Sequence, residues 1–277
     1  ESPSIFLDKE TREKIFNYAL RFARALRYES VGTVEFLVSP GKDVYFMEIN
    51  PRLQVEHPIT EARTGIDLVE QQIRIAQRES LRFRQEEVRV SGYALEARIL
   101  AEDPAEGFIP SSGQITEYSP PTGSGISLHT FLHKGQRIYP YFDSLLAKLV
   151  SFGQSREEAI SRLKKALEGF CIRGVPTTIP FFKALLRSDK FLAGDYFTDF
   201  IEKSGVLKDI SAVREMSLRR QNRKSFAGDK HCPEIPISDK LQNPQSRCPL
   251  HRPPASSDAH RFLCVKPHGR SRPVYYR

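Results

Sequence analysis

The amino-acid sequence predicts an α+β protein, and three observations lead to that class. A helix-period apolar stripe near the start is followed by two strand-like runs joined by turn residues. Residues 87–150 then form short strand-like segments broken by Gly, Pro and Ser. Helical patterns return from residue 155 onward. Strands followed by helices predict a second domain, antiparallel β with helices, between about residues 85 and 204.

The first predicted helix begins after Asp8, which can cap it, and runs to about Tyr28. Its apolar stripe consists of Ile15, Ala19, Phe22 and Leu26. Two strand-like runs follow at 33–38 and 44–50, and the turn residues between them predict an antiparallel hairpin with the four-residue loop 40–43. A further helix is expected to be capped within residues 64–67 and to end at about Gln77.

The second domain is expected to contain strands within 88–100, 114–132 and 141–153. Ser155 and Glu158 have the spacing of a capping box and predict a helix whose apolar positions are Ala159, Leu163, Ala166 and Phe170. Another helix is expected to start near Pro180, because proline is favoured in the first helical turn.

Composition limits the class of protein. Of the 277 residues 39% are hydrophobic and 27% are charged, and no apolar run approaches the roughly 20 residues needed to cross a bilayer. The first residues have neither a basic segment nor an apolar core, so we find no secretory signal. Four cysteines do not form a disulfide framework in a chain of this length, which indicates a reducing compartment.

The net charge of +8 is confined to the last quarter of the chain. Residues 1–205 contain 27 Lys and Arg against 28 Asp and Glu, whereas residues 206–277 contain 15 against 6. A field that would steer a polyanion is therefore not expected of the folded part, and we expect no nucleic-acid or membrane partner. Residues 206–277 also contain 8 of the 19 prolines and no sustained period. We expect a basic, Pro-rich, disordered tail over 205–277.

The second strand of the predicted hairpin is unusually polar. Because side chains alternate along a strand, Glu48, Asn50 and Arg52 are expected on one side, and Met47, Ile49 and Pro51 on the core side. The loop 40–43 sets a register in which Glu35 lies directly opposite Glu48. Facing carboxylates in such a pair have Cβ atoms about 5 Å apart and repel each other, so a cation is expected between them.

Two carboxylates and an amide oxygen form a hard, all-oxygen ligand set that suits Mg²⁺ or Mn²⁺. Magnesium bound by few carboxylates usually completes its shell with phosphate oxygens, which suggests a nucleoside triphosphate. The alternative is that Glu35 and Glu48 lie on a solvated sheet face with Arg52 as their partner.

The stretch E-I-N-P-R-L-Q-V-E-H-P-I-T-E-A-R-T-G-I-D-L-V resembles the metal and bicarbonate segment of the biotin carboxylases, the ATP-grasp ligases of biotin-dependent carboxylases. The resemblance continues through GTVEFL upstream and through GYALEARILAEDP, FIPSSGQITEY, YPYFDSLLAKLV and IRGVPTTIPF downstream. It covers roughly residues 1–204. It implies the C-terminal part of an ATP-grasp fold over 1–84 and a biotin carboxylase C-terminal domain over 85–204.

The resemblance also implies roles for individual residues. Glu35 and Glu48 would ligate Mg²⁺ bridging the phosphates of ATP, with Asn50 assisting.

Arg52, Gln54 and the backbone N–H of Val55 resemble the bicarbonate cradle, where the planar guanidinium suits a planar oxyanion. Glu56 resembles the base that deprotonates bicarbonate, and Arg52 is expected beside it, stabilising its charged form.

Arg98 resembles the residue that stabilises the enolate of biotin, since a positive charge at a developing oxyanion is often a large catalytic contribution. A plain salt bridge between Arg98 and Glu96, which share a strand face, is the alternative. His57 follows the proposed base and is expected to be structural.

The activity implied by the resemblance is ATP-dependent carboxylation of biotin by bicarbonate, through carboxyphosphate. Its cofactors would be Mg²⁺ or Mn²⁺, ATP, and biotin on a carrier protein, because no biotin-acceptor motif occurs in this chain. The implied partners are a biotin carboxyl carrier protein or domain, a carboxyltransferase and a second copy in a homodimer. The expected location is the cytoplasm, or the mitochondrial matrix or plastid of a eukaryote.

The sequence departs from the family pattern at both ends. The glycine-rich lid, the nucleotide-binding lysines and the adenine segment of the family have no counterpart here, so this chain alone is expected not to turn over ATP and to be a fragment. A catalytically inactive structural or dimerisation role is one alternative. Another is a zinc-binding, nucleic-acid-binding tail. Its candidate ligands would be His231, Cys232, Cys248, His251, His260 and Cys264.

Overall fold

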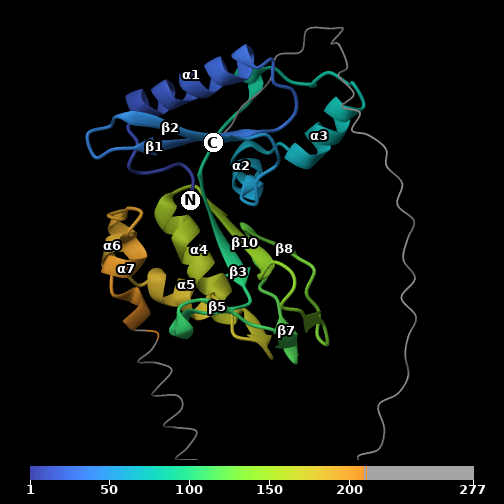
Figure 1. The fold of residues 1–277 in the computed structure, drawn as a ribbon, viewed down its shortest axis with the longest axis vertical. Coiled ribbons are helices and arrows are strands. Elements are labelled where there is room, and N and C mark those ends of the chain that lie inside the picture. Colours follow the sequence, from blue (N-terminus) through green and yellow to red (C-terminus); the bar gives the residue numbers. More distant parts are fainter. Residues whose placement is uncertain (209, 211–277) are drawn as a thin grey trace, which may run out of the picture. The chain divides into compact units, whose positions relative to one another are not determined.

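The computed structural model describes residues 1–208 and 210 (Figure 1). The first elements are α1 (Lys9–Ala25), β1 (Thr33–Val38), β2 (Val44–Asn50), α2 (His57–Thr64), α3 (Leu68–Ala76) and η1 (Gln85–Glu87). The strands and short turns that follow are β3 (Tyr93–Leu100), β4 (Glu102–Asp103), η2 (Pro104–Glu106), β5 (Ile109–Pro110), β6 (Gly113–Gln114), β7 (Glu117–Ser119), β8 (Ile126–Thr130), β9 (Arg137–Ile138) and β10 (Leu145–Gly153). The last elements are α4 (Arg156–Gly169), β11 (Cys171–Arg173), α5 (Ile179–Leu185), α6 (Asp189–Ala193) and α7 (Phe200–Lys203). The α+β class is confirmed.

Helix α1 begins as predicted, because the Asp8 carboxylate accepts the backbone N–H of Thr11 at 2.8 Å. It ends three residues before the expected Tyr28, where Arg27 adopts a left-handed φ of 48°. The helix packs on the hairpin through aromatic pairs, of which Phe22 and Phe46 have ring centroids 4.7 Å apart. The hairpin therefore has one face covered by α1.

The hairpin of β1 and β2 brings Glu35 opposite Glu48, as predicted, but by a different route. Val38 pairs with Val44, so the connection spans the five residues 39–43 instead of four. A β-bulge in β2 compensates for this shift. Met47 is the extra residue, because it lies between Phe46 and Glu48, the partners of Phe36 and Glu35.

The bulge also decides which side chains of β2 face α1. Phe46 pairs with Phe36 and Glu48 pairs with Glu35, so Phe46 and Glu48 lie on opposite faces although they are two residues apart. The predicted core side was therefore wrong for Met47 and Pro51, which are exposed, and only Ile49 is half-buried.

Helix α2 was not predicted, whereas α3 begins as expected, because the Asp67 carboxylate accepts the N–H of Glu70 at 2.8 Å. Two local signals mark α2: Pro58 lies in its first turn, and Gly65 ends it with a φ of 71°. The chain therefore turns from the polar strand β2 into a helix within a few residues.

The second half of the described chain is built around the antiparallel sheet β3-β10-β8 (Figure 1). Its register places Lys148 opposite Arg98 on one side and opposite His129 on the other. Short antiparallel pairs, namely β4 with β5, β6 with β9 and β7 with β11, complete this half. The predicted strands are confirmed, and helix α5 begins next to Pro180 as expected.

One face of this sheet forms the main core with α4. Its buried side chains are Leu95, Ala97, Ile99, Ala147, Leu149, Ala159, Leu163, Ala166 and Leu167. Helix α4 is capped by Ser155, whose hydroxyl accepts the N–H of Glu158 at 3.2 Å, while the Glu158 carboxylate accepts the N–H of Gln154. Because side chains alternate in strands, Glu96, Arg98 and Lys148 lie on the opposite face.

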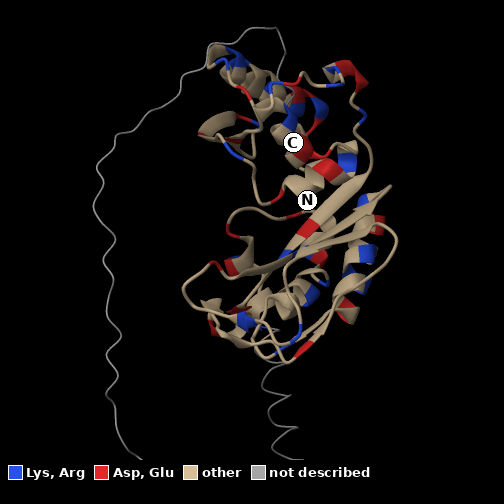
Figure 2. Cartoon of the chain, turned by 90° about the vertical axis from the view of Figure 1, so that its right-hand side faces the viewer, with Lys and Arg blue, Asp and Glu red and all other residues tan. Residues whose placement is uncertain are grey.

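The tail was expected to begin at residue 205, but the folded part continues beyond it. Val206 and Ile210 are buried against Phe181, so the first residues of the expected tail pack on the folded part. The expected disorder of the remaining tail and its zinc-site alternative lie outside the described residues. Among the described residues, Lys and Arg are interspersed with Asp and Glu (Figure 2).

We expect Leu167→Ala to lower the free energy of unfolding by about 3 kcal/mol, because the fully buried side chain leaves a cavity in the main core. Glu168→Ala, on the exposed side of the same helix, should change it by less than about 0.5 kcal/mol. Urea denaturation measures both variants. Equal effects of the two substitutions would contradict the assigned core face of α4.

Candidate functional site

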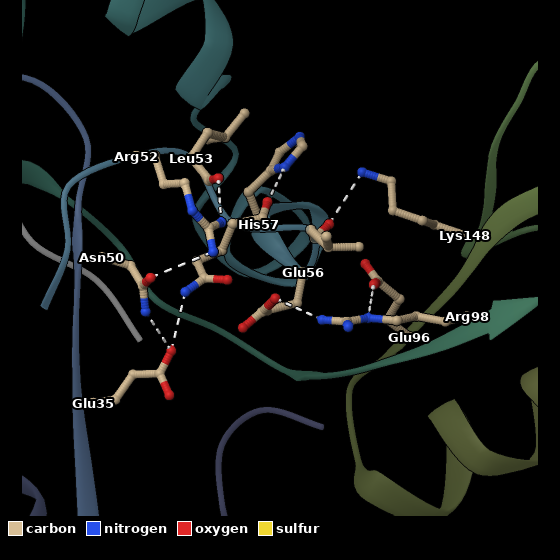
Figure 3. Close-up of polar contacts among 11 residues, drawn as sticks. Glu35, Asn50, Arg52, Leu53, Glu56, His57, Glu96, Arg98 and Lys148 are labelled. Atoms are coloured by element: carbon tan, nitrogen blue, oxygen red, sulfur yellow. Dashed lines mark hydrogen bonds and ion pairs between the residues drawn. The ribbon is translucent and has the colours of Figure 1, made fainter. Parts of the chain in front are cut away.

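Glu56 and Arg98, two of the residues singled out in the sequence, meet where the start of α2 lies on the polar face of the β3-β10-β8 sheet (Figure 3). Asn50 is the last residue of β2, and the segment 51–55 leads from it toward α2. Arg98 lies in β3 and Lys148 lies in β10. The site therefore joins side chains from the two halves of the described chain.

Glu35, Glu48 and Asn50 form one polar group at the end of the hairpin. The Asn50 amide nitrogen donates to Glu35 at 2.9 Å and to Glu48 at 2.7 Å, so both carboxylates converge on one atom. Gln54 also donates to the same oxygen of Glu35, at 3.0 Å. Converging carboxylate and amide oxygens are the donors that Mg²⁺ prefers. The carboxylates of Glu35 and Glu48 therefore fit a hard divalent cation, whereas Asn50 presents its amide nitrogen to them and its oxygen to Arg52.

This group has only two acidic members. Within residues 1–208 and 210, no cluster of three or more His, Cys, Asp or Glu side chains could hold a metal ion. A cation at Glu35 and Glu48 would thus keep coordination positions for other ligands, as Mg²⁺ does when it binds phosphate oxygens.

Arg52 does not lie where it was expected. Its guanidinium donates to the Asn50 side-chain oxygen and to the Leu53 carbonyl, both at 3.3 Å. The expected contact with Glu56 is replaced by another cation, Arg98, whose Nη2 donates to the Glu56 carboxylate at 2.8 Å (Figure 3). Arg52 is exposed and points to the Asn50 side of the site.

Glu56 sits at the N-terminus of α2 without capping it by its side chain, so its carboxylate is available to Arg98. The next residue, His57, places its Nδ1 2.8 Å from the Gln54 carbonyl, and its backbone N–H bonds the same oxygen at 3.3 Å. His57 thus closes the turn that carries Gln54, Val55 and Glu56, which supports the structural role expected for it.

Glu96 and Arg98 also interact, as in the salt bridge considered above as the alternative role of Arg98. Arg98 Nε is 3.7 Å from a Glu96 oxygen, so the guanidinium lies between two carboxylates. The Glu96 side chain is only 3% exposed, and neither of its oxygens accepts a hydrogen bond. Burial raises the pKa of Glu96 to about 7, although Lys148 and Arg98 oppose the shift.

Lys148 was missed in the sequence. Its ammonium group donates to the Val55 carbonyl at 3.1 Å, which ties β10 to the segment before α2 (Figure 3). The available signal was a single cation in the otherwise apolar run of β10. The sequence does not show what this cation faces, because only the strand register places Lys148 opposite Arg98.

The fold and the site are those of the ATP-grasp class. Residues 1–84 match the ATP binding domain of the carbamoyl-phosphate synthase L chain, and residues 96–203 match the biotin carboxylase C-terminal domain. The chain belongs to the biotin carboxylase family.

Curated relatives and solved structures agree with this assignment. Biotin carboxylase 1 of Bacillus subtilis is 45% identical over 208 residues, which are 75% of this chain and 46% of that protein. The biotin carboxylase of a Nostoc species is 44% identical over 203 residues, 73% of this chain and 45% of that protein. The chain thus spans less than half the length of these relatives.

Among solved structures, the biotin carboxylase domain dimer of Hydrogenobacter thermophilus 2-oxoglutarate carboxylase, in complex with MgADP, ADP and bicarbonate, superposes with a TM-score of 0.72. It is 43% identical, and the match covers 74% of this chain and 46% of that one. Within the residues described here, no helix is long and apolar enough to span a membrane.

The buried Glu96 predicts a pH-dependent stability. The unfolded chain releases this proton near the ordinary value of 4.5, whereas the folded chain retains it up to about pH 7. Raising the pH from 5 to 8 should therefore lower the free energy of unfolding by up to about 3 kcal/mol, and the loss should be complete above pH 7. Urea denaturation at several pH values measures this dependence.

Glu96→Gln should flatten the curve over this range, because the substituted side chain has no proton to lose. Glu168→Gln, at an exposed position, is the matched control and should leave the slope as it is. The same slope in the parent and in Glu96→Gln would show that another group causes the dependence.

Proposed function

We propose that this chain forms part of a biotin carboxylase that carboxylates biotin with bicarbonate at the expense of ATP, through carboxyphosphate. The observation that carries the proposal is Glu56, a carboxylate held by Arg98 beside the oxygen-rich group of Glu35, Glu48 and Asn50. A base and an anion-binding cation lie here next to a site that fits Mg²⁺, as transfer of a phosphoryl group to bicarbonate requires.

Glu35, Glu48 and Asn50 would hold the metal in this proposal. When bound, Mg²⁺ or Mn²⁺ neutralises charge on the phosphate oxygens of ATP. Repulsion between the facing carboxylates of Glu35 and Glu48 would be relieved by the same ion. The hydrogen bonds from Asn50 hold the two carboxylates together until then.

Arg52, Gln54 and the Val55 N–H would bind bicarbonate, with the guanidinium of Arg52 facing the planar anion. Glu56 accepts the proton of bicarbonate as a bicarbonate oxygen attacks the γ-phosphorus of ATP, and ADP leaves with the electrons of the broken P–O bond. The products are carboxyphosphate and ADP. Carboxyphosphate then breaks down to carbon dioxide and phosphate, and phosphate takes the ureido proton of biotin.

Arg98 would stabilise the biotin enolate that results, whose ureido nitrogen then attacks carbon dioxide to form the new N–C bond. The contact between Arg98 and Glu56 couples the deprotonation of bicarbonate to the formation of the enolate. Once Glu56 is protonated it is neutral, and it attracts the Arg98 guanidinium less than the Glu56 carboxylate does. Proton transfer to Glu56 thus frees Arg98 to face the developing oxyanion. Glu96, at 3.7 Å, keeps the guanidinium near the sheet throughout.

We further propose a division into an ATP-grasp part over 1–84, a biotin carboxylase C-terminal domain over 85–204 and a tail over 205–277, of which Val206 and Ile210 pack on Phe181. The ranges of the two family matches support the first two segments. A biotin carboxyl carrier protein or domain and a carboxyltransferase are the proposed partners. A homodimer is supported by the dimeric biotin carboxylase domain from Hydrogenobacter thermophilus. We place the protein in the cytoplasm, or in the mitochondrial matrix or plastid of a eukaryote.

Biotin-dependent ATP hydrolysis in the presence of Mg²⁺ and bicarbonate tests the function. Because the match covers 46% of Bacillus subtilis biotin carboxylase 1, this chain is joined to the part of that protein that it does not match. The joined protein should hydrolyse ATP only when bicarbonate is present, and faster with biotin. Glu56→Gln should lower kcat at least about 100-fold, because it removes the base.

Glu168→Gln, an exposed change of the same chemistry on α4, should leave kcat unchanged. A folded joined protein without activity would contradict the proposed function and favour a structural role. An active Glu56→Gln variant would contradict the role of Glu56 as base.

A further inference from the structure

Lys148 is a charged residue in the middle of β10, a strand whose other residues are mostly buried. Its neighbours in β10, Ala147 and Leu149, are buried against α4, so Lys148 projects from the opposite face of the sheet. There it faces the segment before α2, and its Nζ donates to the Val55 carbonyl at 3.1 Å. The contact joins positions 93 residues apart in the sequence.

The bonded carbonyl belongs to the peptide that links Val55 to Glu56. A peptide unit is planar, so a restraint on its oxygen also restricts the nitrogen and Cα of Glu56. Arg98, which lies opposite Lys148 in the register, holds the carboxylate of the same residue at 2.8 Å. Glu56 is therefore held at two points, by its main chain and by its side chain, from adjacent strands.

Glu96 lies buried beside the two cations of this face. It stands on β3 two residues before Arg98 and opposite Val150 of β10, and its carboxylate is buried 3.7 Å from the Arg98 guanidinium. Lys148 and Arg98 both stabilise its charged form, while Glu56 opposes it. The three side chains of the sheet and Glu56 thus form one electrostatic group (Figure 3).

We propose that Lys148 is a positioning residue that holds Glu56 in place through the Val55 carbonyl while Arg98 holds its carboxylate. This inference rests on the function proposed above for Glu56. A proton acceptor must lie within hydrogen-bond reach of the proton it takes, and small displacements of such a group are costly. A single side-chain contact to the preceding carbonyl limits that displacement.

Hydrogen exchange on the full 277-residue chain tests the contact without any activity. Lys148→Met removes the donor and retains most of the side-chain volume. The amides of His57 and Ile59, which bond within the first turn of α2, should exchange about tenfold faster in this variant. The Gly65 amide at the far end of α2 and the amides of β1 and β2 should exchange at the parent rate. Lys164→Met, an exposed lysine of α4, is the matched control.

Kinetics of the joined protein described above test the consequence for the reaction. Lys148→Met should lower kcat about 100-fold while KM for ATP stays within about twofold, because Glu56 is displaced and the nucleotide ligands are not. Lys148→Arg should recover part of kcat, since it retains a cationic donor. A merely structural lysine would change stability without this separation of kcat from KM.

The outcomes separate this inference from the proposed function. Unchanged exchange at His57 and Ile59 in Lys148→Met would overturn the positioning role whatever the activity. Faster exchange with an unchanged kcat would overturn it as well. An inactive parent protein would count against the proposed function, and exchange alone would then decide whether Lys148 holds the segment.

Discussion

The ion pair between Arg98 and Glu56 is the interaction on which the candidate site depends. It links the start of α2 to strand β3 over 42 positions of sequence, at 2.8 Å. It connects the segment that follows the hairpin to the face of the second sheet that carries Arg98 and Lys148. Lys148 strengthens the same link through the main chain, and Glu96 lies buried beside Arg98. Local electrostatics therefore joins what the two family matches treat as separate segments.

Strand β3 shows how closely fold and site are connected. Leu95, Ala97 and Ile99 are buried in the core, while Glu96 and Arg98 alternate with them toward the site. A register slip of one residue would exchange the two sets, burying the guanidinium and exposing the core. The apolar packing against α4 thus sets the strand register, and the register decides on which face Glu96 and Arg98 lie. In the hairpin, the bulge likewise separates core and site residues, because Phe46 faces α1 and Glu48 lies on the other face.

The parts of the site that could be predicted from sequence are those set by local patterns. The pairing of Glu35 with Glu48 follows from a hairpin, and the caps at Asp8 and Asp67 follow from their side chains. The bulge could not be predicted, because a five-residue loop and an extra Met47 leave the same register as a four-residue loop. The partner of Glu56 could not be predicted either. Arg52 is near in sequence, but only the packing of α2 on the sheet brings Arg98 closer.

A double-mutant cycle between Glu56 and Arg98 tests the central claim most directly. Unfolding free energies are measured for the parent, Glu56→Gln, Arg98→Met and the double variant. Both side chains are more than a third exposed, so the predicted coupling is about 0.5–1 kcal/mol. A coupling of that size would establish that the ion pair holds the site together in solution. Additive effects, with no coupling beyond error, would contradict the account.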